Sequence, residues 1–386
     1  MQMNILLTGG RTPAVLALAR AFRRAGQTVF MAESLRGHLS QPSNALQASF
    51  VVPAPRQNHE AFLVALNRII AGNRIDLLIP GGEEIFHIGA GREQLPCVIF
   101  AEPINKLDHL YNRWHFVINA IENDLYAPET MLINSHDNLL QAYAHWRGLI
   151  FKPVYSRLAS RTMVLPPLKK ALSTLKYDPP WIAQEYIEGQ RYSTYSVCHN
   201  GHITAHATYP CSVRTREGAP ILFEHVEHHA IFRWVKTFVQ RNRFSGQISI
   251  DFMEAANRQL FALECLPYAA GGVHLLASHP QFVEAFLNPV MNCITPPGDR
   301  AHMLSGGMLS EALPASLASG GFRQWLKTFL TSDDVILDFR DPLPFLLQFR
   351  GILAHRILAW KHGITPLEAS RLDIEWTGAA DTPTAV

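Results

Sequence analysis

Two carboxylates stand in neighbouring strand-like runs of the segment "GQISIDFMEAANRQLFALEC". Asp251 lies in "ISIDFM", where polar and apolar residues alternate, and Glu264 lies in "QLFALEC", which alternates in the same way. A period of two is typical of half-buried strands, and the polar "AANR" between the runs indicates a hairpin loop. If Met253 pairs with Ala262, Asp251 lies directly opposite Glu264.

Like charges that face each other destabilise an antiparallel pair, because the opposed Cβ atoms are only about 4.5–5.5 Å apart. A buried Lys or Arg would offset the repulsion, as would protonation of one acid with a raised pKa. A divalent cation with oxygen ligands from both acids would do the same. Simple solvation on an exposed face is the remaining explanation, and the hairpin alone leaves all four open.

The bulk composition describes a globular protein of two or three domains. The chain has 386 residues, of which 48% are hydrophobic and 17% charged, with a formal net charge of +2. This charge argues against a nucleic-acid-binding surface as the main function. Five cysteines without a CxxC pair indicate neither a disulfide framework nor a zinc site, so we expect a reducing cytoplasmic setting. "MQMNILLTGG" is typical of a first strand rather than a signal peptide, and no stretch is apolar enough to span a membrane.

Residues 1–105 alternate between strand and helix patterns. "NILLT", a helix ending at Gly26, and "TVFMAE" form one βαβ unit, and "HEAFLVALNRIIAGN", "IDLLIPGGEE" and "CVIFAE" continue the series. The alternation predicts an open, mostly parallel α/β sheet.

The turn "TGGRTP" lacks the GxGxxG spacing of a nicotinamide-cofactor site. A glycine turn before a helix can still hold a substrate carboxylate, which makes Gly10 and Arg11 candidates, although a plain tight turn has the same pattern. Glu83 or Glu84 follows the next strand at the same edge and could face a ligand crevice, or could be a solvated acid at a helix start.

A lysine ends the apolar strand "GLIFKP". Lys152 is followed by a polar loop with Arg157 and Arg161, which is a reasonable phosphate-binding arrangement, although surface basic residues would look the same. "WIAQEYIEG" is a short strand that runs into a glycine turn, and its exposed backbone could hydrogen-bond an adenine edge or could simply join two domains.

In this order, these pieces resemble the ATP-grasp superfamily over most of residues 3–277. The most specific match is to stand-alone enzymes related to carbamoyl-phosphate synthetase, whose last motif has the form GQxSxDF followed by ECNPRxxSGxHL; here it reads "GQISIDF" and "ECLPYAAGGVHL". The resemblance implies a mixed α/β fold with a Rossmann-like N-terminal domain, an ATP-grasp domain pair and a C-terminal cap. The implied boundaries are 1–105 for the Rossmann-like domain, 106–205 for the linker helix and lid, 206–300 for the catalytic subdomain, 301–376 for the cap and 377–386 for a flexible tail.

The resemblance also implies roles for particular residues. Asp251 and Glu264 would ligate Mg²⁺, with Mn²⁺ as an alternative cation, and Lys152 would contact the ATP phosphates. The other implied nucleotide-binding residues are Arg113, Gln184, Glu185, Tyr186, Ile187 and Arg191. The last motif adds Tyr268, Gly271, Gly272 and His274 as candidate substrate residues.

Three positions depart from the pattern of the resembled enzymes. Leu266 stands where they have the Asn after the metal-binding Glu, Tyr268 replaces their Arg, and Arg191 replaces their ribose-binding Glu. Leucine cannot ligate magnesium, and a lost guanidinium removes a charge that would stabilise a transferred phosphoryl group. Candidate replacements for the lost arginine are Arg157, Arg161, Arg214 and Arg216.

The leading interpretation is an ATP-dependent carboxylate–amine ligase that works through an acyl phosphate. Its partners would be a small carboxylate and an amine, with no nucleic acid and no membrane, and the resemblance allows a homodimer. The alternatives are a catalytically silent ATP-binding regulatory protein, favoured by the three departures, and a nicotinamide-dependent oxidoreductase built on the first βαβ unit.

Overall fold

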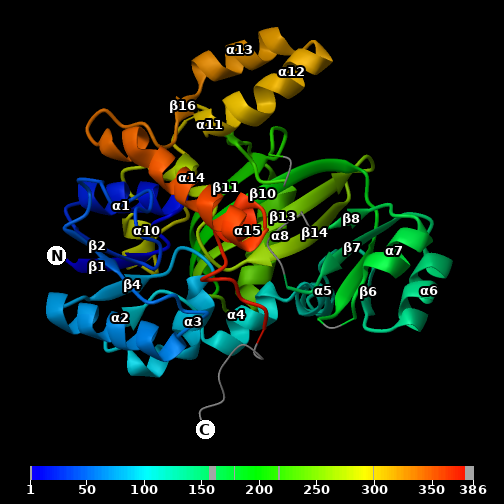
Figure 1. Ribbon diagram of the computed structural model, residues 1–386, viewed down its shortest axis with the longest axis horizontal. Coiled ribbons are helices and arrows are strands. Elements are labelled where there is room, and N and C mark those ends of the chain that lie inside the picture. Colours follow the sequence, from blue (N-terminus) through cyan, green and yellow to red (C-terminus); the bar gives the residue numbers. More distant parts are fainter. Residues whose placement is uncertain (1, 156–161, 178, 216–217, 299, 379–386) are drawn as a thin grey trace.

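The computed structural model describes residues 2–155, 162–177, 179–215, 218–298 and 300–378. The predicted mixed α/β class is confirmed: a parallel sheet at one end of the molecule is followed by two antiparallel sheets and a mostly helical C-terminal region (Figure 1). None of the helices in these ranges is long and apolar enough to cross a membrane.

The N-terminal sheet has five parallel strands in the order β3-β2-β1-β4-β5. Its strands are β1 Asn4–Thr8, β2 Thr28–Glu33, β3 Ala48–Val51, β4 Leu77–Ile79 and β5 Val98–Ile99, and its helices are α1 Pro13–Arg24, α2 His59–Asn73, α3 Glu84–Ala90 and α4 Ile104–Tyr111, with a 3-10 turn at Arg92–Gln94. The short strand β3, at the sheet edge beside β2, was not predicted from the sequence.

The expected single helix after residue 105 is two helices. α4 ends at Tyr111, and α5 Arg113–Glu122 begins after Asn112, whose backbone is extended (φ −65°, ψ 113°) and whose side chain accepts a hydrogen bond from the His115 amide. This N-cap satisfies a free amide of α5 and fixes a new helix direction. Arg113 therefore becomes the first residue of α5.

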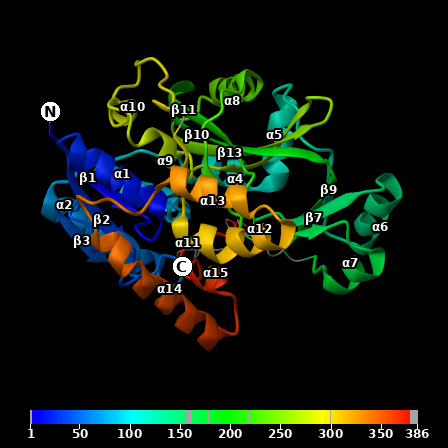
Figure 2. The ribbon, with the colours of Figure 1, turned by 90° about the horizontal axis from the view of Figure 1, so that it is seen from above.

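The region predicted to form the lid, a name we keep for it, contains a four-stranded antiparallel sheet in the order β6-β9-β7-β8. It contains β6 Thr130–Ile133, β7 Leu149–Pro153, β8 Met163–Val164 and β9 Trp181–Glu185, with α6 His136–His145 and α7 Leu168–Thr174 against it. It forms a separate lobe with its own buried core (Figures 1 and 2).

The large antiparallel sheet has the order β11-β10-β13-β14. Its strands are β10 Gly189–His199, β11 His202–Pro210, β13 Gly246–Ala255 and β14 Leu260–Leu266, and α8 His229–Arg241, α9 Val273–Leu276 and α10 Glu284–Leu287 accompany it. The predicted boundary placed residues 106–205 with the lid. The structure instead pairs β10 and the start of β11, which lie before residue 205, within the large sheet. α5 and α8 share a buried cluster with β13 and β14.

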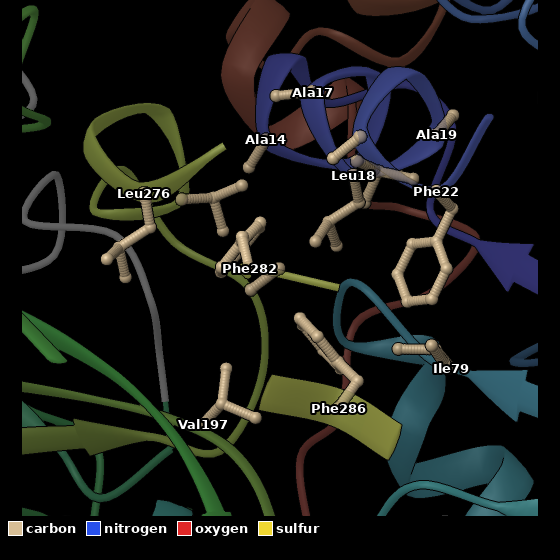
Figure 3. Packing of buried hydrophobic residues seen from close by; sticks show 14 of the residues in the cluster. Ala14, Ala17, Leu18, Ala19, Phe22, Ile79, Val197, Leu276, Phe282 and Phe286 are labelled. Carbon is tan, nitrogen blue, oxygen red and sulfur yellow. The ribbon is translucent and has the colours of Figure 1, made fainter. Parts of the chain in front are cut away.

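A second buried cluster joins the large sheet to the N-terminal domain. Phe22 of α1 packs edge-on against Phe286 of α10, with ring centroids 5.3 Å apart, and Val197 of β10 belongs to the same cluster (Figure 3). This shared core holds the parallel sheet and the large sheet in one fixed arrangement.

The C-terminal region packs over these layers. A small sheet joins β12 Leu222–Phe223, β15 His302–Met303 and β16 Asp333–Asp334. The helices are α11 Ser305–Gly307, a π-helical turn Met308–Ala312, α12 Leu313–Ser319, α13 Phe322–Thr331, α14 Leu343–His362 and α15 Pro366–Ala369. The segment after α15 returns to the N-terminal domain (Figure 1).

Candidate nucleotide site

The two carboxylates of the hairpin face each other as predicted. Asp251 pairs with Glu264 in the β13–β14 ladder, but Ala262 pairs with Phe252 rather than Met253, because the register shifts between Asp251 and Phe252. Such a shift is a β-bulge, which places one extra residue in β14 and increases the local twist. The predicted opposition is therefore correct, and the register on the turn side of it is wrong by one residue.

Two arginines bind the opposed acids. The Arg191 guanidinium donates to Asp251 Oδ2 and, at 3.2 Å, to Glu264 Oε1. The Arg113 guanidinium binds Glu264 Oε2 at 2.6 Å. The repulsion recognised in the sequence is thus offset by buried basic residues, the first of the four explanations.

Helix and strand geometry bring these arginines to the acids. Arg113 is fixed at the start of α5 by the Asn112 cap, and its Nη1 also donates to Pro153 O at 3.0 Å, which ties α5 to the end of β7. Arg191 lies on β10, where it is the ladder partner of Met253. No strand or helix periodicity signals that either arginine would reach the hairpin.

Lys152 lies beside this group at the end of β7. Its Nζ donates to Gln184 Oε1 at 2.9 Å, and Gln184 Nε2 donates to Thr130 Oγ1 at 3.0 Å. Burial lowers the pKa of Lys152 to about 8, and the nearby positive charges of Arg113 and Arg191 add to this, whereas Glu264 opposes it. A buried lysine whose hydrogen-bond partner is a neutral side chain is well suited to bind an anion.

The charges of the cluster favour a polyanionic ligand. Burial raises the pKa of Glu264. The positive charges of Arg113, Arg191 and Lys152 lower this pKa by more than burial raises it, so that Glu264 is held ionised. The cluster therefore contains three basic side chains, Lys152, Arg113 and Arg191, and only two carboxylates, Asp251 and Glu264, so it has an excess of positive charge. We define these five residues as the charged cluster.

A divalent cation does not fit the acid pair in this arrangement. Guanidinium donors occupy Asp251 Oδ2 and both oxygens of Glu264. Leu266, which lies where a third ligand would be expected, pairs with Ser249 and packs against apolar neighbours. Over the described ranges, no group of three or more His, Cys, Asp or Glu side chains could hold a metal ion.

The predicted adenine hinge follows β9. Glu185 ends this strand and pairs with Leu149, whereas Tyr186 and Ile187 lie outside the ladder. The Tyr186 amide donates to Gly148 O at 3.0 Å, and its side chain is partly exposed. The segment thus joins the lid to β10 beside the charged cluster, and its role in adenine binding remains a prediction.

Of the candidate replacements for the missing arginine, Arg214 alone lies within the described ranges. Arg157, Arg161 and Arg216 lie outside the described ranges. Arg214 is exposed and forms an isolated bridge with Pro220.

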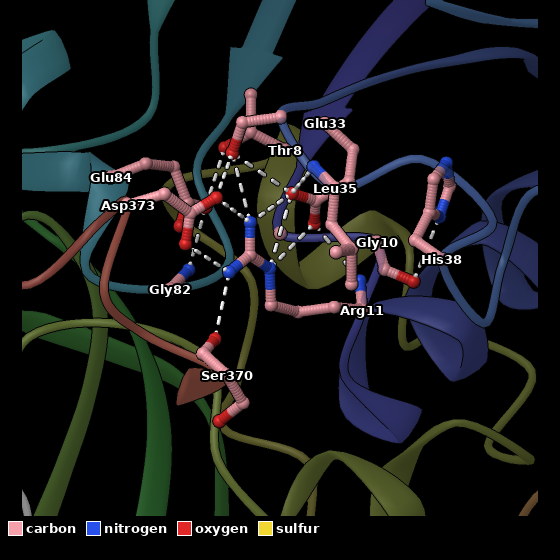
Figure 4. A network of polar contacts seen from close by, with 12 residues as sticks. Thr8, Gly10, Arg11, Glu33, Leu35, His38, Gly82, Glu84, Ser370 and Asp373 are labelled. Carbon is pink, nitrogen blue, oxygen red and sulfur yellow. Dashed lines mark hydrogen bonds and ion pairs between the residues drawn. The ribbon is translucent and has the colours of Figure 1, made fainter. Parts of the chain in front are cut away.

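The predicted carboxylate site at the first glycine turn is filled by the chain's own acids (Figure 4). The Arg11 guanidinium binds Glu33 and, at 2.7 Å, Asp373, and it also donates to Ser370 O at 2.8 Å. The Gly10 carbonyl lies 3.1 Å from His38 Nδ1. Arg11 therefore fastens the C-terminal segment to the N-terminal sheet.

Glu83 and Glu84 are buried at the start of α3. Glu84 Oε1 accepts hydrogen bonds from Thr8 at 2.7 Å and from the Gly82 amide at 2.9 Å, and burial raises the pKa of this carboxyl. Glu83 Oε2 accepts a hydrogen bond from the Trp376 amide at 3.3 Å. Both acids are thus buried after β4, and the C-terminal segment contacts Glu83.

The other candidate substrate residues lie in closely packed surroundings, and their role in substrate binding stays a prediction. Tyr268 is fully buried, with its ring edge-on to Phe86 at 6.4 Å. A Cβ at Gly271 would lie 2.2 Å from the Phe223 ring, and one at Gly272 would lie 2.4 Å from Tyr195 Cβ, so both glycines allow close contact. His274 is buried, and burial lowers its pKa to about 3.

Asp373 and Trp376 were missed by the sequence interpretation, which assigned residues 301–376 only to a cap. Trp376 is 1% exposed, stacks on Phe86 at 5.7 Å and donates through Nε1 to Asp108 Oδ1 at 2.7 Å. The isolated Trp before a polar tail was the available signal. Of the predicted tail 377–386, residues 379–386 lie outside the described ranges.

The fold is similar to several solved ligases and carboxylases. N5-carboxyaminoimidazole synthetase from Staphylococcus aureus, complexed with ADP, matches with a TM-score of 0.62 and 13% identity over 76% of this chain and 80% of that one. L-amino acid ligase from Bacillus licheniformis matches with a TM-score of 0.59 and 13% identity over 75% of each chain. Biotin carboxylase from Campylobacter jejuni, in a β-γ-ATP complex, matches with a TM-score of 0.59 and 12% identity over 74% of this chain and 71% of that one.

No protein-family model matches the sequence, and no curated protein matches it. The similarity to these solved structures covers about three quarters of the chain. The chain therefore has the ATP-grasp fold.

Proposed function

We propose that the chain binds ATP between the lid and the large sheet, with its phosphates at the charged cluster. The observation that carries this proposal is the convergence of Arg113, Lys152 and Arg191 on only two carboxylates. Arginine and lysine are the side chains that proteins use most to bind phosphate. The solved ADP and β-γ-ATP complexes of proteins with this fold support the same ligand.

The proposed reaction is the ATP-dependent joining of a carboxylate and an amine. A carboxylate oxygen attacks the γ-phosphorus of ATP and ADP leaves, which gives an acyl phosphate. The amine nitrogen then attacks the acyl carbon, loses a proton and displaces phosphate to form an amide bond. The basic side chains would stabilise the charge that spreads over the transferred phosphoryl oxygens, and the lid would exclude water from the acyl phosphate.

An ADP-release assay against paired carboxylates and amines tests this proposal. ADP should appear only when both substrates are present, in amounts equal to the amide formed. Lys152→Met should reduce the rate at least about tenfold, because it removes a charge-assisted phosphate contact. Lys169→Met is the matched control, since Lys169 is exposed on α7. ATP binding without ADP release from any substrate pair would contradict the ligase proposal.

A catalytically silent nucleotide-binding protein is the second candidate. The ion pairs of Arg191 with both hairpin acids favour it, as do the apolar contacts of Leu266 and the buried position of Tyr268. Such a protein would bind ATP with the same residues and respond by a change in lid position. Tight ATP binding together with a failed substrate screen would select it over the ligase.

A further inference from the structure

Arg191 is placed as a bridging cation. Its Nη2 contacts oxygens of both Asp251 and Glu264, the two side chains that a divalent cation would otherwise join. It lies on a central strand of the large sheet, where its backbone pairs with Met253 of β13 and its carbonyl accepts a hydrogen bond from the Cys211 amide, just after β11, at 2.9 Å. The contact of the Arg191 guanidinium with the two acids therefore comes from a residue of strand β10 and not from a loop.

We propose that the guanidinium of Arg191 replaces the divalent cation between Asp251 and Glu264, so that the charged cluster binds nucleotide phosphates without added metal. This inference rests on the proposed nucleotide site. It concerns the cation requirement of binding alone and applies equally to the ligase and to the silent protein.

The positive charge already present makes an added cation unfavourable. With Arg113, Arg191 and Lys152 around two carboxylates, an incoming Mg²⁺ would meet a positive environment and would have to displace Arg191 from both acids. Displacement would leave a guanidinium with only 22% of its side-chain surface exposed and no acid to pair with. Breaking a buried ion pair in this way is strongly unfavourable, because it leaves a buried charge uncompensated.

Arg191 also keeps an unused donor. Its Nε is buried and has no hydrogen-bond partner within the described part of the chain. Buried donors without partners are rare, and one in a group of basic side chains is suited to a phosphate oxygen. Arg191 can thus hold the two acids with Nη2 and still contact an anion with Nε.

Calorimetric titration with ATP, in EDTA and in excess MgCl₂, tests the inference. The wild-type Kd in EDTA should lie within about threefold of the Kd in Mg²⁺, a difference well below the 1.4 kcal/mol of a tenfold change. Arg191→Gln should weaken binding in EDTA by at least about tenfold, and Mg²⁺ should restore much of the loss because the acids are then free to ligate it. Arg241→Gln, which removes an exposed arginine from α8, should behave as wild type.

Wild-type binding that needs Mg²⁺ would overturn this inference and leave the proposed function standing. ATP binding in neither condition would overturn both. If the glutamine variant fails to fold, Arg191→Lys, which keeps a positive charge at this position, takes its place, and it should still bind ATP in EDTA, more weakly than the wild type. Loss of all ATP binding by this folded variant in both conditions would contradict the inference.

A titration with Mn²⁺ alone, followed by electron paramagnetic resonance, gives an independent result. The wild-type protein should leave the spectrum of free Mn²⁺ unchanged, whereas Arg191→Gln should bind Mn²⁺ and reduce the free signal. Binding of Mn²⁺ by the wild type at the same concentration would show that Arg191 does not take the place of the cation.

Discussion

Arg191 and Asp251 form an ion pair across neighbouring strands although they are not ladder partners. Arg191 pairs with Met253 and Asp251 pairs with Ser193, so the two charged residues are diagonal neighbours on β10 and β13. Diagonal neighbours on one face of a sheet are within reach of long side chains. The diagonal lets a single guanidinium contact Asp251 on β13 and Glu264 on β14 together.

A double-mutant cycle should show that Arg113 and Glu264 act as a unit. Arg113→Met and Glu264→Gln should each lower the free energy of unfolding by about 3 kcal/mol, since each breaks the largely buried ion pair between these two residues. The double variant should lose less than the sum of the two. Urea unfolding of the four proteins measures the coupling, which we expect to be roughly 1–3 kcal/mol. Additive losses would show that the pair contributes no interaction of its own.

Nucleotide affinity should depend on the side-chain amide that holds Lys152. Gln184→Leu removes the acceptor 2.9 Å from Lys152 Nζ and leaves the apolar part of the side chain in β9. The lysine should then be less well placed, and we expect the Kd for ATP to rise by about 3- to 10-fold, in line with a hydrogen bond to a charged group. Gln190→Leu is a suitable control, because Gln190 is exposed on β10. An unchanged Kd for Gln184→Leu would mean that Lys152 is positioned without it.

The parts of the fold that follow a simple period were predictable from the sequence. The βαβ pattern predicts the parallel sheet, and the alternation around Asp251 and Glu264 predicts the hairpin and its opposed acids. The bulge was not predictable, because one extra residue preserves alternation on either side of it. The break at Asn112 was hidden in a continuous helical pattern, since a cap residue is also an acceptable helix residue.

The side chains that surround the acids could not be predicted from local patterns. Arg113, Arg191 and Glu264 lie far apart in the sequence, and their meeting depends on how α5, β10 and β14 pack. The motif resemblance placed Arg191 where the resembled enzymes have their ribose-binding Glu, whereas its guanidinium contacts the hairpin acids. The partners of Arg11 were missed for the same reason, because Asp373 lies 362 positions away.

The stability of the protein should fall on mild acidification, in part through His206. Burial, and to a smaller extent His225, lowers the pKa of His206 to about 3, and its ring nitrogens lie 2.8 Å from Ser196 Oγ and 2.9 Å from Thr208 Oγ1. In the unfolded chain a histidine titrates near pH 6.5. Between about pH 6.5 and 3 the unfolded state therefore binds a proton that the folded state does not. This contribution to stability is fully present above about pH 6.5, and as the pH falls from there towards 3 it is lost by up to roughly 1.4 kcal/mol per pH unit.

His206→Gln should remove this part of the pH dependence. Urea unfolding of the variant between pH 7.5 and 5 should give a shallower slope than the wild type, while buried His274 remains in both proteins. His229→Gln is the control, because its side chain is 80% exposed. Equal slopes for wild type and His206→Gln would mean that His206 accepts a proton in the folded protein.

Trp376 should anchor the C-terminal segment to the N-terminal domain. Trp376→Ala removes the stacking on Phe86 and the hydrogen bond to Asp108, and we expect a loss of about 3–5 kcal/mol in the free energy of unfolding. Trp376→Phe should lose less, because it keeps the stacked ring. Trp360→Ala is a matched control on α14, where the side chain is 84% exposed and its removal should change stability by less than about 0.5 kcal/mol. Equal effects at the two positions would contradict an anchoring role.

Restoring the arginine of the resembled motif at position 268 should destabilise the protein rather than activate it. Tyr268 is fully buried among Phe86, Tyr111 and Trp376, and ionised arginine cannot lose its charge there. Tyr268→Arg should therefore lower the free energy of unfolding by more than about 4 kcal/mol, as expected for an unpaired buried charge. Leu266→Asn, at a half-buried position, should cost less and remain folded. A stable Tyr268→Arg protein would contradict this prediction and would show that the guanidinium had reached either water or the acids of the hairpin.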